Sequence, residues 1–347
     1  MSVEKTSRRL GGLCAHIANH VGKPRVAGVA AATDFAATDY FGFGIVGCGM
    51  IASFHQEAIA DLGGIGARLV GCVDAVAEAA QRFGAEHSCK VYGSLEEMLA
   101  DPAVTIVTIC TPSGLHMEPA VAAAAAKKHV IVEKPLEITL ERCDKIIDAC
   151  ASNGVTLGTV FPTRFHDSSQ RLKEAVDEGR FGTLTMGDAY VKWFRDQAYY
   201  DSGAWRGTWA MDGGGALMNQ AIHSVDMLLY LMGDVALVAG AQKATRAHER
   251  VEVEDVVVAS LRFKNGALGC IEASTAAFPG ASKRVEVNGS AGSVVIEEEN
   301  VSAWAFAEEQ PKDAQIRGSL KAVLKDNRGA SDPTNFPSDG HRKVSEQ

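Results

Sequence analysis

The sequence predicts an α/β protein with two domains: a doubly wound parallel sheet on the N-terminal side, then an α+β domain with an open, mostly antiparallel sheet. From residue 43 to residue 160, short apolar runs alternate with helical patterns, which is the rhythm of βαβ units. A glycine-rich turn follows the first apolar run. From residue 235 to residue 304, apolar and polar residues alternate between turn signals, which is typical of antiparallel strands.

The glycine-rich turn has the sequence GCGMIA at residues 47–52, between a strand predicted at 43–46 and a helical pattern. In this context G-x-G-x-x-G/A predicts a Rossmann dinucleotide-binding site. Gly47 permits the tight turn, Gly49 lets a pyrophosphate approach the backbone, and Ala52 allows close packing of helix on strand. The pyrophosphate would lie at the positive N-terminal end of the helix.

A carboxylate ends the second predicted strand: residues 68–73 (RLVGCV) form the strand, and Asp74 follows them. This side chain can accept hydrogen bonds from ribose hydroxyls, and it would repel a 2′-phosphate. No arginine or lysine follows immediately, so we expect NAD rather than NADP. Taken alone, Asp74 also fits an N-cap of a helix at 75–83. Strand, glycines and acid together favour the dinucleotide interpretation.

The rest of the first domain keeps the same rhythm. Helices are predicted at 53–62, 95–100, from His116 to Lys127 and at 140–152, and strands at 90–92, 104–110, 130–132 and 156–160. Ser94 and Glu97 form a predicted capping box. Two loops lie at the carboxyl ends of strands, where such sheets bind ligands. Thr111-Pro112 would lie beside the nicotinamide ribose, and Glu133-Lys134-Pro135 presents an ammonium group.

The second domain is predicted to place helices on a broad sheet. Helices are expected at 165–179 and 216–232, a long strand at 183–194, and an aromatic and basic loop at 195–211. Asn219 and His223 are four residues apart, so they share a helix face, and Asp226 could orient the imidazole of His223. Glycines at 213–215 let a ligand come close to this helix. A buried core histidine is the alternative for His223, as a solvated lysine is for Lys134.

Composition excludes several classes of protein. The net charge of −9 and the pI near 5.6 argue against nucleic acid or an anionic membrane as partner. Eight cysteines form no C-x-x-C pair, which predicts reduced thiols, no metal site and no zinc-dependent alcohol dehydrogenase. Reduced thiols are typical of a cytoplasmic protein, which is the location we expect. No apolar run reaches ~18 residues, so we expect no transmembrane helix. Ser7-Arg8-Arg9 faintly resembles a twin-arginine export signal, but no clean apolar stretch follows it.

Five motifs occur together with the order and spacing of a known family. They are GCGMIA at 47–52, Thr111-Pro112-x-x-x-His116, Glu133-Lys134-Pro135, Trp205-Arg206-Gly207 and GGALMNQAIHSVD at 214–226. From about residue 43 to about residue 301, the sequence resembles the glucose–fructose oxidoreductase / inositol 2-dehydrogenase / MocA (Gfo/Idh/MocA) family of NAD(P)-dependent sugar dehydrogenases. The resemblance implies a Rossmann domain followed by an open-faced α/β domain. It also implies homodimers or homotetramers that form through the second sheet.

The resemblance implies roles for single residues. Lys134 matches the family's catalytic lysine, and the peptide before Pro135 is expected to be cis. His223 matches the catalytic histidine. Many members have Asp four residues before that histidine; this sequence has Asn219, which cannot carry a proton and is expected to orient by hydrogen bonding. Met-Asn-Gln before Ile-His is similar to the UDP-N-acetylglucosaminuronate 3-dehydrogenase branch.

We therefore expect an oxidoreductase that transfers a hydride between NAD and a secondary alcohol of a sugar, sugar acid or nucleotide sugar. His223 is favoured as general base with Lys134 polarising the hydroxyl, and the reverse assignment stays open. The expected cofactor-binding residues are Gly47, Gly49, Met50, Ile51, Asp74, Thr111, Pro112, His116, Glu133 and Lys134. The expected substrate residues are Arg164, Trp205, Arg206, Asn219 and His223. The alternative is a non-catalytic, dinucleotide-binding regulatory protein on the same fold.

Four segments are expected along the chain. They are a loosely ordered extension (1–40), an NAD-binding Rossmann domain (41–161), a substrate and oligomerisation domain (162–310) and a polar tail (311–347). Members of the family usually continue with another long helix after a segment like Gly340-His341-Arg342-Lys343. Because this sequence stops at Gln347, we expect its tail to be truncated.

Overall fold

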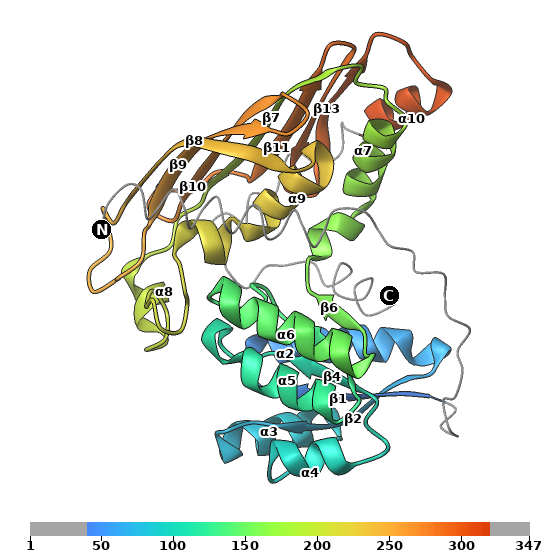
Figure 1. Ribbon diagram of the computed structural model, residues 1–347, viewed down its shortest axis with the longest axis vertical. Helices are drawn as coiled ribbons and strands as arrows, with labels where there is room; N and C mark the ends of the chain where they lie inside the picture. The colour runs from blue at the N-terminus through green and yellow to red at the C-terminus, as the bar shows by residue number, and fades with distance from the viewer. Residues whose placement is uncertain (1–39, 320–347) are drawn as a thin grey trace. The chain divides into compact units, whose positions relative to one another are not determined.

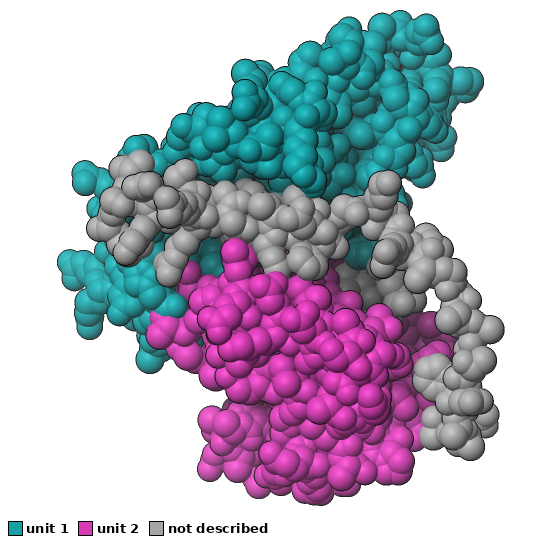
Figure 2. Space-filling view, in the orientation of Figure 1, with its two compact units in different colours: residues 1–24, 163–209, 214–336 teal, residues 25–162, 210–213, 337–347 magenta. Residues whose placement is uncertain are grey.

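The computed structural model describes residues 40–319, which form two compact units (Figure 1). Of these residues, the N-terminal unit contains 40–162 and 210–213, and the C-terminal unit contains 163–209 and 214–319 (Figure 2). The segment 210–213 thus packs with the N-terminal unit although it lies far along the chain. The expected N-terminal extension and most of the expected polar tail lie outside the described residues.

A six-stranded parallel sheet is the centre of the N-terminal unit. Its strands are β1 (Phe41–Val46), β2 (Ala67–Val73), β3 (Lys90–Val91), β4 (Ile106–Ile109), β5 (His129–Val132) and β6 (Leu157–Thr159). They lie in the order β3-β2-β1-β4-β5-β6. The connecting helices are α2 (Met50–Asp61), α3 (Ala77–His87), α4 (Leu95–Ala100), α5 (Met117–Ala125) and α6 (Leu140–Asn153). The predicted doubly wound sheet is confirmed, and its strand order reverses between β1 and β4, where such sheets bind ligands.

The starts of two helices in this unit test the sequence-based predictions. The Oγ of Ser94 accepts the N–H of Glu97 at 3.2 Å, and the Glu97 carboxylate accepts the N–H of Gly93 at 2.8 Å. This reciprocal capping at α4 is what the sequence predicted. Helix α3 instead has Val76 as its N-cap residue, so the alternative in which Asp74 caps that helix is wrong.

A seven-stranded sheet is the centre of the C-terminal unit. Its strands are β7 (Leu184–Lys192), β8 (Val235–Ala244), β9 (Val256–Phe263), β10 (Leu268–Ser274), β11 (Arg284–Gly289), β12 (Gly292–Glu297) and β13 (Asn300–Phe306). They lie in the order β13-β12-β11-β7-β10-β9-β8, and only the β7–β10 pair is parallel among them. The predicted open, mostly antiparallel sheet is therefore confirmed.

Helices cover one face of this second sheet. They are α7 (Asp167–Asp177), α9 (Ile222–Met232) and α10 (Pro311–Ser319) (Figure 1). A Cβ on Gly187 of β7 would lie 2.5 Å from the side chain of Met232, so glycine allows α9 to approach the sheet closely. On the opposite face, Met186 of β7 lies beside Leu268 of β10, and both side chains are exposed.

Three elements of the C-terminal unit differ from the sequence-based prediction. A short helix, α8 (Gln197–Asp201), lies within the loop expected at 195–211. The helix expected at 216–232 is broken: a π-helical turn, η4 (Ala216–Gln220), precedes α9. Residues 311–319 were expected to begin a polar tail, but they form α10, in which Asp313 is fully buried. Asp313 pairs with Arg180 at 2.6 Å and accepts the indole N–H of Trp304 at 2.7 Å. This helix is thus fixed to the sheet by a buried charge.

No helix within residues 40–319 combines the length and the apolar character needed to cross a lipid bilayer.

Candidate active site

The glycine loop joins β1 to α2 in the N-terminal unit. Gly47 has a φ of +91°, and a Cβ there would lie 2.8 Å from the carbonyl carbon of Cys110, so the tight turn requires glycine. A Cβ on Gly49 would meet nothing within 4 Å. Open space therefore lies over the backbone at the start of α2, where Met50 is exposed and Ile51 is half-buried. These residues fit a pyrophosphate group.

Asp74 braces the glycine loop from the end of β2. Its Oδ2 accepts the N–H of Cys48 at 2.7 Å, and its Oδ1 accepts the N–H of Val76 at 2.8 Å. The carboxylate is partly exposed and keeps further acceptor capacity, because each oxygen has two lone pairs. The arrangement is compatible with the predicted ribose contact and adds a second function, which is to hold the loop.

The loop after β4 contains Thr111, Pro112 and His116. The hydroxyl of Thr111 donates to the carbonyl of Leu115 at 3.0 Å. His116 is 1% exposed, with Nδ1 2.9 Å from the carbonyl oxygen of Pro135 and Nε2 2.9 Å from that of Thr111. The buried ring therefore ties the loop after β4 to the loop after β5. The bracing is a role that the sequence did not indicate for His116, whose predicted contact with the cofactor stays a prediction.

The loop after β5 contains Glu133, Lys134 and Pro135, and the Lys134–Pro135 peptide is cis, as the resemblance implied. Glu133 is buried; one carboxylate oxygen lies 2.9 Å from Nε2 of His55, and the other accepts the N–H of Lys134 at 3.0 Å. The Lys134 side chain is partly exposed. Sequence reasoning missed His55, which lies on α2 and is 78 residues from Glu133. A histidine on the buried face of a helix that follows a nucleotide loop was the available signal.

A polar network surrounds the broken helix of the C-terminal unit. The amide of Gln220 donates to Oδ1 of Asn219 at 2.7 Å and to the hydroxyl of Tyr199 at 3.0 Å. The guanidinium of Arg206 donates to the same Tyr199 hydroxyl at 2.8 Å. Arg206 also lies 4.5 Å from the ring centre of Tyr199 and 4.7 Å from that of Trp205. All five side chains are partly exposed, so they offer hydrogen-bonding groups and aromatic faces to a ligand.

His223 is the second residue of α9 and is half-buried. The predicted orienting partner, Asp226, is fully buried and binds Arg164 instead: Nε at 2.7 Å from Oδ2 and Nη2 at 2.5 Å from Oδ1. Arg164 also lies 4.8 Å from the ring centre of Tyr230. The prediction for Asp226 is therefore corrected. Arg164 forms an ion pair with it, and the predicted contact of Arg164 with substrate stays a prediction. The sequence placed both residues near the site without showing that they pair with each other.

The predicted residues thus fall into two groups. The N-terminal unit brings together the glycine loop, Asp74, the loop after β4 and the Glu133–Pro135 loop. The C-terminal unit brings together Arg206, Trp205 and Asn219, with His223 four residues further along. The additional residues Tyr199 and Gln220 join this second group.

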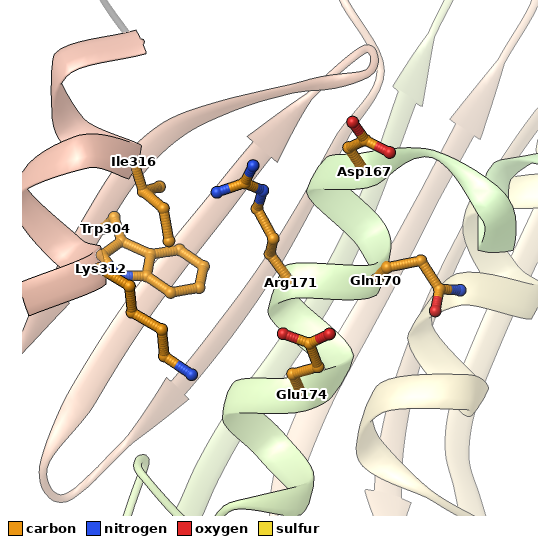
Figure 3. A pocket seen from close by; sticks show the side chains of 7 residues that line it. All are labelled: Asp167, Gln170, Arg171, Glu174, Trp304, Lys312 and Ile316. Carbon is orange, nitrogen blue, oxygen red and sulfur yellow. The ribbon is translucent and has the colours of Figure 1, made fainter. Parts of the chain in front are cut away.

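A separate pocket of about 370 Å³ lies in the C-terminal unit between α7, β13 and α10 (Figure 3). Its lining residues are Asp167, Gln170, Arg171, Glu174, Trp304, Lys312 and Ile316. None of the predicted catalytic or cofactor-binding residues is among them. Within the described chain, no three His, Cys, Asp or Glu side chains are arranged to hold a metal ion.

Comparison with known proteins relates both units to one family. Residues 41–161 match the model of an oxidoreductase family with an NAD-binding Rossmann fold, and residues 169–295 match the model of the GFO/IDH/MocA C-terminal domain. A myo-inositol 2-dehydrogenase of Thermotoga maritima is 31% identical over 77% of this chain and 78% of its own. A levoglucosan dehydrogenase of Pseudarthrobacter phenanthrenivorans is 34% identical over 67% of this chain and 65% of its own.

A solved structure is similar over most of the chain. It is the WlbA dehydrogenase from Bordetella pertussis in complex with NADH and UDP-GlcNAcA, with a TM-score of 0.80 and 36% identity. The match covers 89% of this chain and 87% of that one.

Proposed function

This chain belongs to the Gfo/Idh/MocA family of NAD-binding oxidoreductases, and from that premise we propose how it works as an NAD-dependent sugar dehydrogenase. Lys134 and His223 act on one substrate hydroxyl. The observation that carries this proposal is the loop after β5. Its buried Glu133 binds the N–H of Lys134, which fixes the backbone while the side chain stays partly exposed. A solvated surface lysine would not need a buried carboxylate to hold its backbone N–H.

The N-terminal unit would hold the cofactor. Gly47, Gly49 and the first turn of α2 receive the pyrophosphate, Asp74 receives the adenosine ribose, and the Thr111-Pro112 loop borders the nicotinamide ribose. When bound, NAD supplies the hydride acceptor. The carboxylate of Asp74 disfavours a 2′-phosphate, which favours NAD over NADP.

The protein's own residues handle the proton. His223 takes the proton from the substrate hydroxyl, and the ammonium of Lys134 donates a hydrogen bond to the same oxygen. Asn219 has no titratable group, so its amide orients the substrate through hydrogen bonds. This division of roles is supported by the chemistry of the side chains and by the partial exposure of all three.

The substrate class is a sugar, sugar acid or nucleotide sugar. The network of Arg206, Tyr199, Gln220 and Asn219 supports this class, because it combines amide and hydroxyl groups with a guanidinium that suits a carboxylate or phosphate. Trp205 adds an aromatic face for the apolar side of a sugar ring. The likeness to a dehydrogenase solved with UDP-GlcNAcA makes a nucleotide-sugar acid the first substrate to test.

We also propose a homodimer or homotetramer that forms through the open face of the second sheet. Met186, Leu237, Val258 and Leu268 leave apolar side chains exposed on strands β7 to β10. Burying such side chains between two copies would remove them from water. The proposed location is the cytoplasm, in keeping with a nicotinamide-dependent reaction on a small metabolite.

The test is reduction of NAD, and then NADP, followed by nicotinamide absorbance over a panel of inositols, free sugars, anhydrosugars and UDP-sugars. We expect one substrate class to reduce NAD, and Lys134→Ala to lower kcat by about 10²- to 10⁴-fold. Lys145→Ala is the matched control, because Lys145 lies on α6 in an exposed pair with Glu141. Unchanged kcat in Lys134→Ala would contradict the role of Lys134. Tight NAD binding without turnover of any sugar would instead favour the non-catalytic regulatory protein.

A further inference from the structure

The start of the broken helix in the C-terminal unit is held by one residue of a distant segment, Glu254. Its carboxylate oxygen Oε1 accepts the N–H of Gly215 at 3.0 Å and the N–H of Leu217 at 3.3 Å. Its backbone carbonyl accepts the N–H of Ala216 at 2.8 Å. Three consecutive N–H groups, which a helix start leaves without partners of its own, therefore all donate to Glu254.

Glu254 lies so close to the backbone at position 215 that only glycine fits there. A Cβ on Gly215 would lie 1.7 Å from the carbonyl oxygen of Glu254. The π-helical turn follows immediately: the N–H of Asn219 donates to the carbonyl of Gly215 at 2.9 Å, and that of Ala221 donates to the carbonyl of Ala216 at 2.9 Å. The second of these spans five residues, which is the π-helical pattern. The hydrogen bonds of this turn thus start from groups whose positions Glu254 fixes.

Glu254 itself precedes a residue that is hydrogen-bonded to two neighbouring segments. The next residue, Asp255, is fully buried; its N–H donates to the carbonyl of Ala244 at 3.0 Å, and its carbonyl accepts the N–H of Thr275 at 2.9 Å. These contacts connect the segment before β9 to the ends of β8 and β10. The Glu254 side chain is buried as well, and burial is the main cause that raises the pKa of its carboxyl group. Burying an acidic side chain costs free energy unless its carboxyl group is hydrogen-bonded, as it is here.

We propose that Glu254 is a positioning residue for the substrate site: by holding the N-terminal end of η4, it sets the directions of Asn219 and His223. The inference rests on the proposed function only for the roles of those two residues. In a straight α-helix, residues four apart share one face. Here Asn219 belongs to the π-helical turn and His223 to α9, so the angle between them depends on how the turn is wound. Removing the Glu254 side chain frees the N–H groups of Gly215 and Leu217, so the turn can rewind and the side chains of Asn219 and His223 move apart.

The experiment compares Glu254→Ala and Glu254→Gln with the wild-type full chain. Glu249→Gln is the control, because Glu249 is an exposed glutamate five residues earlier. Hydrogen exchange of peptides that cover residues 215–221 is measured first, since this readout does not need a substrate. We expect local exchange at least tenfold faster in Glu254→Ala, partial recovery in Glu254→Gln, which keeps an acceptor oxygen, and no change in the control.

Steady-state kinetics then test the link to the site. In Glu254→Ala we expect kcat to fall about 10- to 100-fold. The Kd for NAD should stay unchanged, because the residues proposed to bind it belong to the other unit. If Glu254→Ala shows faster local exchange but an unchanged kcat and KM in an active enzyme, the proposal is overturned. Unchanged exchange in Glu254→Ala would overturn it as well. If the wild type turns over no sugar, the proposed function fails while the exchange data still decide whether Glu254 holds the turn.

Discussion

The Lys134 loop and the broken helix before His223 are positioned in two different ways. Lys134 follows a buried parallel strand, and its N–H donates to the carboxylate of the neighbouring residue, Glu133. The turn before His223 depends on Glu254, 37 to 39 residues away along the chain. The hydrogen bond to the Lys134 backbone thus comes from an immediate neighbour, whereas the hydrogen bonds to the turn before His223 come from a distant buried carboxyl group. A sequence motif can predict a contact between neighbouring residues. It cannot predict a contact between residues far apart in the chain, because their separation follows no fixed spacing.

The largest effect is expected at an ion pair of the C-terminal unit whose partners lie far apart along the chain, Arg180 and Asp313. Breaking a buried pair costs about 3–5 kcal/mol, so we expect Asp313→Asn to lower the free energy of unfolding by that amount at pH 7. Both side chains are at most 5% exposed. The control is Lys312→Gln, because Lys312 is the adjacent residue and pairs with Glu178 at the surface. That pair should contribute less than about 1 kcal/mol.

The pH dependence of this difference follows from the pKa of Asp313. Hydrogen bonds from Arg180 hold this pKa below its usual range. A carboxyl group with a lowered folded-state pKa stabilises the protein above its unfolded-state pKa of about 3.9 and loses that contribution as the pH falls further. Denaturant unfolding at pH 7, 5 and 3.5 should therefore show a constant gap between wild type and Asp313→Asn at the first two values, and a smaller gap at the third. A gap that grows on acidification would contradict the ion pair.

A smaller effect, on NAD affinity, is expected at the glycine loop of the N-terminal unit, where the cofactor would approach the backbone itself. Gly49→Ala should weaken NAD binding on the order of tenfold, because the methyl group would occupy the space that a pyrophosphate approaches. Gly63→Ala is matched to it: a Cβ at either glycine meets nothing within 4 Å, so neither substitution strains the protein itself. Isothermal titration with NAD measures the cofactor affinity of each variant, and thermal unfolding measures its stability separately. Equal NAD affinity in both variants would show that the cofactor does not approach Gly49.

Much of the N-terminal unit could be predicted from sequence because its signals are local. The turn at Gly47 and the cap at Ser94 appear in the structure as expected, and so does the cis peptide at Pro135, which the family resemblance implied. The pairing of His55 with Glu133 could not be predicted, because 78 residues separate the two partners. His116 illustrates a further limit: the motif identified the residue, but only the structure shows that its buried ring braces two loops.

The C-terminal unit was predicted well in its sheet and less well in its polar contacts. Alternation of apolar and polar residues was enough for the antiparallel strands. The spacing of Asn219, His223 and Asp226 predicted one continuous helix face, but the π-helical turn interrupts that helix and Arg164 binds Asp226. A helical period in the sequence cannot show one extra residue per turn, nor which of several arginines reaches a buried carboxylate.

The most direct test of the account is a double-mutant cycle on kcat with the sugar that reduces NAD, using Lys134→Ala, His223→Ala and the double variant. If both residues act on one hydroxyl, the double variant should be about as slow as the slower single variant, because residues that act as one unit are not additive. Thermal unfolding of each variant serves as the control for folding. Losses that simply multiply would show that the two residues act independently and would contradict the proposed Lys134–His223 pair.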